Sequence, residues 1–345
     1  MEKNTTDYMV KVLEELLNIP SPSGFTKAAT EWVRALVTEL GFESEYLAKG
    51  GLLVKVPGRN PELTIGVSAH LDTLGAMVRS INSNGTLRFI PVGGIPMQTL
   101  ESEHCRIHTR SGKVYTGTFL CNSMTVHVYD DARTLERVPK NMHIRIDERV
   151  KTKEDVQALG INTGDYISYG PDFMFTESGF IKSRFLDDKA SVAILLTMLA
   201  QMKEEGKQPE YNLNLLVTNM EEVGFGCNYI PSEIREFIAV DMGAIGDDLN
   251  GNEYSVSICA CDGGGPYDYE ITGRLQEAAK AAGVEYVVDV FSNYSSDATT
   301  AMRGGNNVRI GLLGPGIHAS HGMERTHISA MEGTLKTLQQ YLQIA

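Results

Sequence analysis

Helix-like and strand-like segments alternate along both ends of this chain of 345 residues. Apolar residues recur at helical spacing in the segments 7–18, 25–40, 187–205 and 267–282 and in the last residues of the chain. Between them lie short apolar runs, such as LTIGVSA (63–69) and YNLNLLVT (211–218), which predict buried strands. Helices that alternate with apolar strands cover both faces of a mostly parallel or mixed sheet. We therefore expect an α/β domain with a mixed sheet.

The alternation is interrupted between about residues 75 and 178, where the helical spacing disappears. This stretch consists of short strand-like pieces separated by Gly and Asn turns, for example GTLRFI, KVYTGTF and DYISYG. A chain of this length also exceeds what one compact core usually holds. We expect residues 75–178 to form an inserted, barrel-like β domain, and residues 1–74 and 179–345 to form one discontinuous α/β domain.

The charge of the chain argues against a nucleic-acid partner, because 31 Lys and Arg face 44 Asp and Glu, and phosphate binding needs clustered basic residues. The longest apolar stretch, ASVAILLTMLA (190–200), is too short to cross a bilayer, and the first residues carry no signal-peptide core. The five cysteines are odd in number and form no C-x-x-C pair, which fits a reducing compartment. We expect a cytoplasmic protein that binds neither nucleic acid nor membranes.

Acidic and histidine residues follow the predicted strands of the α/β domain. They are His70 and Asp72 after LTIGVSA, Asp187 and Asp188 at the start of a helix, Glu221 and Glu222 after YNLNLLVT, Asp241 after FIAV, and His321 in the loop after RIGLL. In an open α/β sheet, the loops at the carboxyl ends of the strands converge on one crevice. Histidine and carboxylate ligands without cysteine suit zinc, cobalt or manganese.

Each of these residues alone has an ordinary structural explanation. A histidine at a strand end usually makes a structural hydrogen bond, Asp187 and Asp188 could cap a helix, and a Glu pair at a turn is usually solvated. Together, however, they place repeated charge beside the core, and burying an unpaired ion costs several kcal/mol. A metal centre accounts for all of them at once.

Four segments, in order, resemble the motifs of one enzyme family: AHLD (69–72), FLDDKAS (185–191), NMEEVGFG (219–226) and AVDMG (239–243). They are similar to the successive motifs of the cocatalytic metallo-aminopeptidases of clan MH, in particular metallopeptidase family forty-two, the tetrahedral or glutamyl-aminopeptidase-like group. The resemblance extends over nearly the whole chain, including the inserted β domain. It implies a phosphorylase/hydrolase-like catalytic domain that uses divalent metal ions to remove N-terminal residues from unblocked peptides. It further implies self-assembly through the insertion into a homo-oligomer, a dodecamer.

The resemblance also implies a role for each matching residue. The implied ligands of two metal ions, zinc or cobalt with manganese as a further option, are His70 and Asp241 for one ion, Glu222 and His321 for the other, and Asp187 as the bridge. Glu221 would be the general base that accepts the proton of the attacking water. Asp72 would orient His70, since a ligand imidazole usually donates its other N–H to a carboxylate or carbonyl.

The last motif departs from the family pattern. Family members commonly end the ligand set with a His-Ser-Pro stretch, whereas this chain reads GIHASHGMERTH (316–327). His321 fits best, because Glu324 and the following helix then fall nearly where the family has its downstream Glu and helix. His318 stays open as an alternative ligand. Asp188, Glu324 and His318 are further candidates for contacts to the substrate or to the ligands.

Other functions compete with an aminopeptidase. The same metal centre could hydrolyse another amide, such as an N-acyl amino acid or a small modified dipeptide. A glycosidase could use two of the carboxylates, but it would leave His70 and His321 without a role. The presence of Glu221 and Asp187 opposes a binding protein with a decayed site. A serine nucleophile in YSSDATT (294–300) lacks the G-x-S-x-G elbow that would frame it.

Overall fold

The computed structural model describes residues 2–345, with side chains from Thr5 onward. The chain forms two compact units. The larger unit contains the residues up to Asp72 together with Asp172–Ala345, and the inserted unit contains Thr73–Pro171. All residues proposed above as ligands or as the base therefore lie in the larger unit.

The inserted unit ends earlier than the expected residue 178, because the segment that follows Pro171 pairs within the larger unit. There β10 (Met174–Phe175) and β11 (Phe180–Ser183) form a small antiparallel sheet with β19 (Glu324–His327). This pairing connects the start of the returning chain to the segment that contains Glu324.

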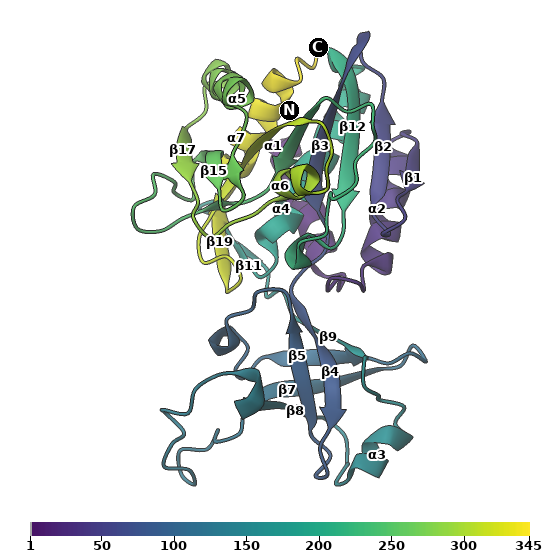
Figure 1. Ribbon diagram of the computed structural model, residues 1–345, viewed down its shortest axis with the longest axis vertical. Helices are drawn as coiled ribbons and strands as arrows, with labels where there is room; N and C mark the ends of the chain where they lie inside the picture. Colours follow the sequence, from purple (N-terminus) through teal and green to yellow (C-terminus); the bar gives the residue numbers. More distant parts are fainter. Residues whose placement is uncertain (1) are drawn as a thin grey trace. The chain divides into compact units, whose positions relative to one another are not determined.

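The larger unit is built around a mixed sheet that has ten strands within residues 2–345 (Figure 1). The order along the sheet is β1 (Ser44–Tyr46), β2 (Leu52–Val56), β12 (Tyr211–Thr218), β3 (Asn60–His70), β13 (Glu236–Val240), β18 (Arg309–Ile317), β15 (Val256–Asp262) and β16 (Gly265–Pro266), with β14 (Gly243–Ala244) beside β18 and β17 (Tyr286–Val290) beside β15. The central strands β12, β3, β13 and β18 are parallel, whereas β2 and β15 are antiparallel to β12 and β18. The mixed sheet expected from the sequence is confirmed.

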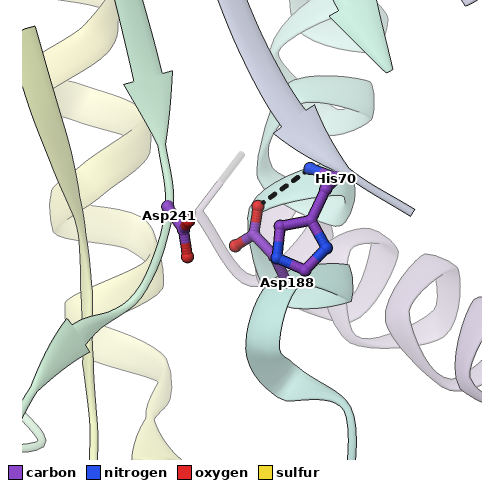
Figure 2. Close-up of side chains that lie close together, drawn as sticks. All are labelled: His70, Asp188 and Asp241. Atoms are coloured by element: carbon purple, nitrogen blue, oxygen red, sulfur yellow. Dashed lines mark hydrogen bonds between the residues drawn. The ribbon is translucent and has the colours of Figure 1, made fainter. Parts of the chain in front are cut away.

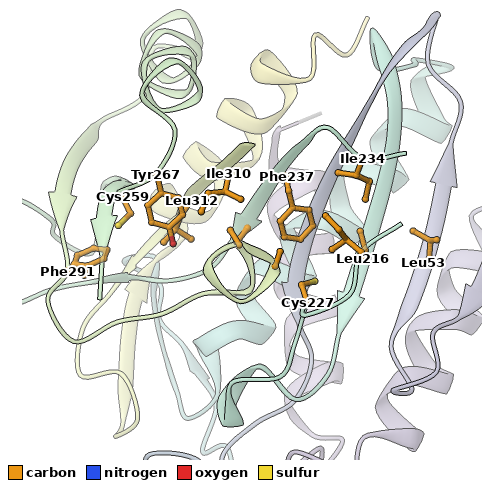
Figure 3. Close-up of a cluster of buried hydrophobic side chains, with 14 residues drawn as sticks. Leu53, Leu216, Cys227, Ile234, Phe237, Cys259, Tyr267, Phe291, Ile310 and Leu312 are labelled. Atoms are coloured by element: carbon orange, nitrogen blue, oxygen red, sulfur yellow. The ribbon is translucent and has the colours of Figure 1, made fainter. Parts of the chain in front are cut away.

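One face of the sheet packs against α6 (Asp297–Arg303). Figure 3 shows the buried cluster on this face, which combines side chains of β2, β12, β13, β15 and β18 with Ala298 and Ala301 of α6. Phe237 and Leu216 lie in the middle of this cluster. Neighbouring residues along each strand point to the opposite face, so both faces need a cover.

The helix α4 (Leu186–Glu205) packs on β3 and β18 and contacts α1 (Glu2–Leu17) and α7 (Ile328–Tyr341). Because α4 lies between the sheet and these helices, most of its residues are buried, which explains its long apolar run. Two further α-helices of the unit are α2 (Lys27–Glu39), which contacts β1, and α5 (Tyr269–Ala282), which packs on α7 and β15. Helices on both faces agree with the expected α/β architecture.

The inserted unit is a closed barrel. Its strands follow the order β4 (Gly75–Ile81), β5 (Leu87–Val92), β8 (Met142–Ile146), β7 (Val114–Cys121), β6 (His104–His108) and β9 (Tyr166–Tyr169), and β9 pairs with β4 to close the ring. Phe89 and Phe119 meet edge to face in its core, with ring centroids 5.0 Å apart. The short helices η1 (Met97–Thr99), η2 (Pro139–Asn141) and α3 (Lys153–Ala158) lie in its connections.

Candidate metal centre

Three neighbouring strands bring candidate residues to one edge of the central sheet. His70 is the last residue of β3, and Asp241 directly follows β13, which is parallel to β3. On the other side of β3, β12 leads into the short helix η3 (Glu221–Val223), which contains Glu221 and Glu222. Because the three strands are parallel, their carboxyl ends lie at the same edge of the sheet.

The turn around η3 depends on glycine. Gly224 ends η3 with a left-handed φ of 77°, which glycine adopts without steric cost. A Cβ atom at Gly226 would lie 1.8 Å from Oδ1 of Asp297, the oxygen that accepts the N–H of Cys227 at 2.8 Å. Asp297 also accepts the hydroxyl of Thr218 at 2.5 Å, so it connects the end of β12 to the chain after the turn.

The carboxylates at the start of α4 face His70. Figure 2 shows Asp188 beside His70, where Oδ2 of Asp188 accepts the backbone N–H of His70 at 3.1 Å, and Asp241 nearby. Oδ1 of Asp187 lies 3.1 Å from Nε2 of the same histidine. Both carboxylates are buried. Both carboxylates therefore contact His70 in addition to lying at the start of α4.

Asp187 lies between the two histidines. Its Oδ1 faces Nε2 of His70 at 3.1 Å, and its Oδ2 lies 3.5 Å from Nε2 of His321. Nε2 of His321 is also 3.4 Å from Oε2 of Glu222. Two sets of potential ligand atoms fall within 4.8 Å of one another: those of His70, Asp188 and Asp241, and those of His70, Asp187 and Glu222.

Asp72 holds the turn that contains the adjacent glutamates. Its two carboxylate oxygens accept the backbone N–H groups of Glu221 at 3.1 Å and Glu222 at 3.4 Å, and the hydroxyl of Ser23 at 2.5 Å. Nδ1 of His70 lies 3.0 Å from the backbone carbonyl of Asp72 and 3.6 Å from its carboxylate. The nearer partner of the imidazole is thus the carbonyl, and the carboxylate mainly positions Glu221 and Glu222.

Glu324 connects two parts of the cluster. It is 2% exposed, and its oxygens accept the backbone N–H groups of Asp187 at 3.0 Å and His321 at 3.1 Å. Burial, together with the charge of Asp187, raises the pKa of Glu324 to about 8. His318 is exposed, and its backbone pairs with Arg325. Of the two histidines weighed from the sequence, His321 is therefore the one near Asp187 and Glu222.

The imidazole of His70 is surrounded by negative charge. Burial lowers the pKa of His70, but its hydrogen bond with Asp187 and the charge of Glu221 outweigh burial and raise this pKa well above its usual value. Burial raises the pKa of Asp187, yet its hydrogen bonds with His321 and His70 bring that pKa below its usual value. The carboxylates around His70 therefore favour its protonated form.

Burial raises the pKa of the remaining carboxyls, and their mutual repulsion adds to it. This holds for Glu221, Glu222 and Asp188, and the pKa of Asp241 rises to about 7. Within residues 2–345, Oε1 of Glu222 and Oδ1 of Asp188 are buried without a hydrogen-bond partner. Such oxygens cost free energy unless a cation neutralises them. The donor set of imidazole nitrogen and carboxylate oxygen therefore fits divalent zinc, cobalt or manganese.

Known proteins share this sequence pattern and fold. Residues 50–337 match the model of the M42 glutamyl aminopeptidase family. The chain belongs to this family. It is similar to the putative aminopeptidase YhfE of Bacillus subtilis (strain 168), with 44% identity over 335 residues that cover 97% of each chain. It is also similar to the glutamyl aminopeptidase of Lactococcus lactis subsp. cremoris (strain MG1363), with 26% identity over 68% of this chain and 66% of that one.

Solved structures agree on the fold of this M42 protein. The TET1 peptidase of Pyrococcus horikoshii matches with a TM-score of 0.85 and 22% identity over 97% of this chain and 99% of that chain. The resemblance drawn from four sequence motifs is confirmed, as is the α/β fold with an inserted β domain. The protein is a hydrolase of the aminopeptidase kind, from a family that depends on metal ions. None of the helices described in residues 2–345 combines the length and apolar character needed to cross a membrane.

Sequence reasoning missed three hydroxyls near the cluster. Ser23 bonds Asp72, Ser320 donates to Oδ2 of Asp187 at 2.8 Å, and Tyr294 donates to the carbonyl of Met242 at 2.9 Å. Ser23 belongs to the SPSG turn and Tyr294 to YSSDATT, which we examined only as a source of a nucleophile. The position of Ser320 directly before His321 is the one signal that pointed to its place.

Proposed function

We propose that this protein is an aminopeptidase that binds two divalent metal ions per chain and removes N-terminal residues from unblocked peptides. The observation that carries the proposal is the position of Asp187, which presents one carboxylate oxygen to His70 and the other to His321. A bridging ligand of a two-metal site needs two oxygens that face two separate sets of ligands.

The first ion would be held by His70 and Asp241, the second by Glu222 and His321, and both by Asp187. Zinc or cobalt suits this ligand set best, with manganese as a further option. When bound, two such ions supply a nucleophilic water at neutral pH, polarise the scissile carbonyl and bind the free α-amine of the substrate. Asp188 is also within reach of His70 and Asp241, and we assign it to orienting the backbone of His70 through their hydrogen bond.

Glu221 would act as the general base. Its side chain is 12% exposed, and its Oε2 lies 3.8 Å from Nε2 of His70, so it borders the ligands without being one of them in this assignment. Burial raises its pKa well above the usual value, which makes the carboxylate a better proton acceptor. Glu221 would take a proton from water and deliver it to the leaving nitrogen. Asp72 positions this residue by accepting its backbone N–H.

A substrate screen tests the proposal. Matched aminoacyl substrates with a free and with an acetylated amine should be offered to the enzyme after loading with zinc, cobalt or manganese. Turnover of the free-amine forms alone, abolished by chelation, is the expected result. Efficient cleavage of the acetylated forms would instead favour the amidase or deacylase. Polysaccharide turnover that survives chelation would favour a glycosidase, and metal binding without turnover of any substrate would favour a binding protein.

We also assign assembly and access to the site to the inserted barrel, which contains none of the proposed ligands. The TET1 peptidase of Pyrococcus horikoshii assembles into a tetrahedron or a large octahedral shell, and another similar structure, PhTET1-12s, is a dodecamer. These neighbours support a homo-oligomer here, a dodecamer by analogy. Replacing the barrel with a short linker should yield a smaller particle in light scattering. An unchanged particle size would contradict the assembly role. A cytoplasmic location is supported by the five cysteines, all of which are free.

A further inference from the structure

The loop between β18 and β19 contains His321 in an unusual backbone conformation. Ala319 and His321 have φ values of 58° and 66°, a left-handed region that residues other than glycine adopt uncommonly. The N–H of Gly322 donates to the carbonyl of Ala319 at 2.9 Å, which closes a tight turn. Ser320 is the residue between the two left-handed positions. The contacts of Ser320 therefore bear directly on where the imidazole of His321 lies.

Ser320 connects this loop to Asp187. Its hydroxyl donates to Oδ2 of Asp187 at 2.8 Å, and the same oxygen lies 3.5 Å from Nε2 of His321. The other oxygen, Oδ1, faces His70, whose imidazole is held separately by the carbonyl of Asp72. The hydroxyl thus contacts the half of the Asp187 carboxylate that faces His321.

We propose that Ser320 is a positioning residue for the second metal site, because it ties the loop of His321 to the oxygen of Asp187 that would bind the second ion. This inference rests on the proposed dinuclear function. A carboxylate oxygen can accept a hydrogen bond and bind a cation at the same time, since it has two lone pairs. The hydroxyl restrains the rotation of the carboxylate and leaves a lone pair of Oδ2, the oxygen 3.5 Å from Nε2 of His321, available to a cation.

The two halves of the site differ in how firmly the fold holds them. The side chain of His70 is 2% exposed, whereas that of His321 is 31% exposed. Packing therefore constrains the imidazole of His70 far more than that of His321. A hydrogen bond from outside the ligand set consequently matters more at the second site, and its loss should affect the two ions unequally.

Metal titration of Ser320→Ala tests this inference without using peptidase activity. The metal-free protein is titrated with zinc by calorimetry, and far-UV circular dichroism checks that each variant is folded. We expect the parent to bind two ions. In Ser320→Ala the first should bind as in the parent, and the second roughly 10- to 100-fold more weakly, the usual effect of losing a partner of a metal ligand. Ser320→Thr keeps the hydroxyl and should restore most of the affinity for the second ion.

The control is Ser232→Ala, an exposed serine outside the metal centre, which should titrate like the parent. Two unchanged binding steps in Ser320→Ala, or equal weakening of both steps, would overturn the role of Ser320 and leave the dinuclear site intact. Failure of Ser320→Thr to recover the second ion would also count against the hydroxyl. Binding of only one ion per chain by the parent would instead refute the proposed two-metal function, and this inference with it.

Discussion

The buried carboxylate of Glu324 offers a demanding test of how the cluster is held together. Each of its oxygens accepts one backbone N–H, from Asp187 at 3.0 Å and from His321 at 3.1 Å. Gln has nearly the same shape, but one of these oxygens becomes an NH₂ group that faces an N–H donor. The substitution Glu324→Gln therefore leaves one buried N–H without an acceptor.

The expected cost follows from this one lost hydrogen bond. Leaving a buried donor unsatisfied costs about 1–3 kcal/mol. For a protein unit of this size class, 1 kcal/mol lowers Tm by about 2–4 °C, so a central value of about 2 kcal/mol lowers it by about 4–8 °C. Because the freed N–H belongs to Asp187 or His321, the second metal ion should also bind more weakly.

Differential scanning calorimetry of the metal-free protein above about pH 8, where Glu324 is ionised and both of its oxygens can accept hydrogen bonds, measures the change in Tm, and zinc titration measures the change in affinity. The matched control is Glu277→Gln, because Glu277 is an exposed residue of α5 and the same chemical change there should leave both quantities unchanged. If Glu324→Gln melts and binds zinc like the parent, the two hydrogen bonds that Glu324 accepts from Asp187 and His321 do not stabilise the cluster.

Three further predictions concern charge. Asp187→Ala should bind neither ion tightly, whereas Asp241→Ala should keep one, as measured by elemental analysis after dialysis. Two tightly bound ions in Asp187→Ala would contradict the role of Asp187 as the ligand shared by both ions. The metal-free protein should lose stability as pH rises toward about 7, because burial and the charge of Asp187 raise the pKa of Asp241 to about 7. Below that pH the folded state holds a proton that the unfolded state has already released. The urea midpoint measures this decline, and zinc should abolish it. Lys189 should make stability rise with pH, because burial lowers its pKa to about 7. Between about pH 7 and 10 the unfolded state therefore binds more protons than the folded state. Lys189→Met should flatten that rise in the urea midpoint, and an unchanged slope would refute this prediction.

The positions of the proposed ligands could be predicted from sequence because a charged residue at the end of an apolar strand is a local signal. His70 ends such a strand, Glu222 and Asp241 come after two others, and parallel strands bring their ends together. The alternation of helices with apolar strands, which is also a local signal, predicted the mixed sheet. Neither inference required knowledge of which distant residues touch.

The supporting contacts could not be predicted, because they depend on tertiary pairing. The carboxylate of Asp72 accepts N–H groups about 150 residues away in sequence, and Glu324 reaches Asp187 only because β19 pairs with β11. The short helix α6 was also missed, since its seven residues, DATTAMR, carry too little apolar periodicity to signal a helix. Asp297 at its start nevertheless fixes the turn after Glu222.

In the proposed mechanism, the adjacent glutamates of NMEEVGFG have different tasks, Glu221 as the base and Glu222 as a ligand. Gln is close in shape to Glu but cannot accept the proton of water at neutral pH, and it is a poorer, uncharged metal ligand. The two variants Glu221→Gln and Glu222→Gln therefore serve as controls for each other. Both side chains leave the same short helix, η3, so a general effect on folding should be shared.

The most direct measurement is the metal content and kcat of these two variants at saturating zinc or cobalt. Glu221→Gln should keep both ions and a similar KM while kcat falls by about 10²–10⁴-fold, the range typical of removing a general base. Glu222→Gln should lose one ion first and recover part of its activity when more metal is added. Glu221→Gln with most of its activity intact, or Glu222→Gln with full metal content and only kcat reduced, would contradict these two roles.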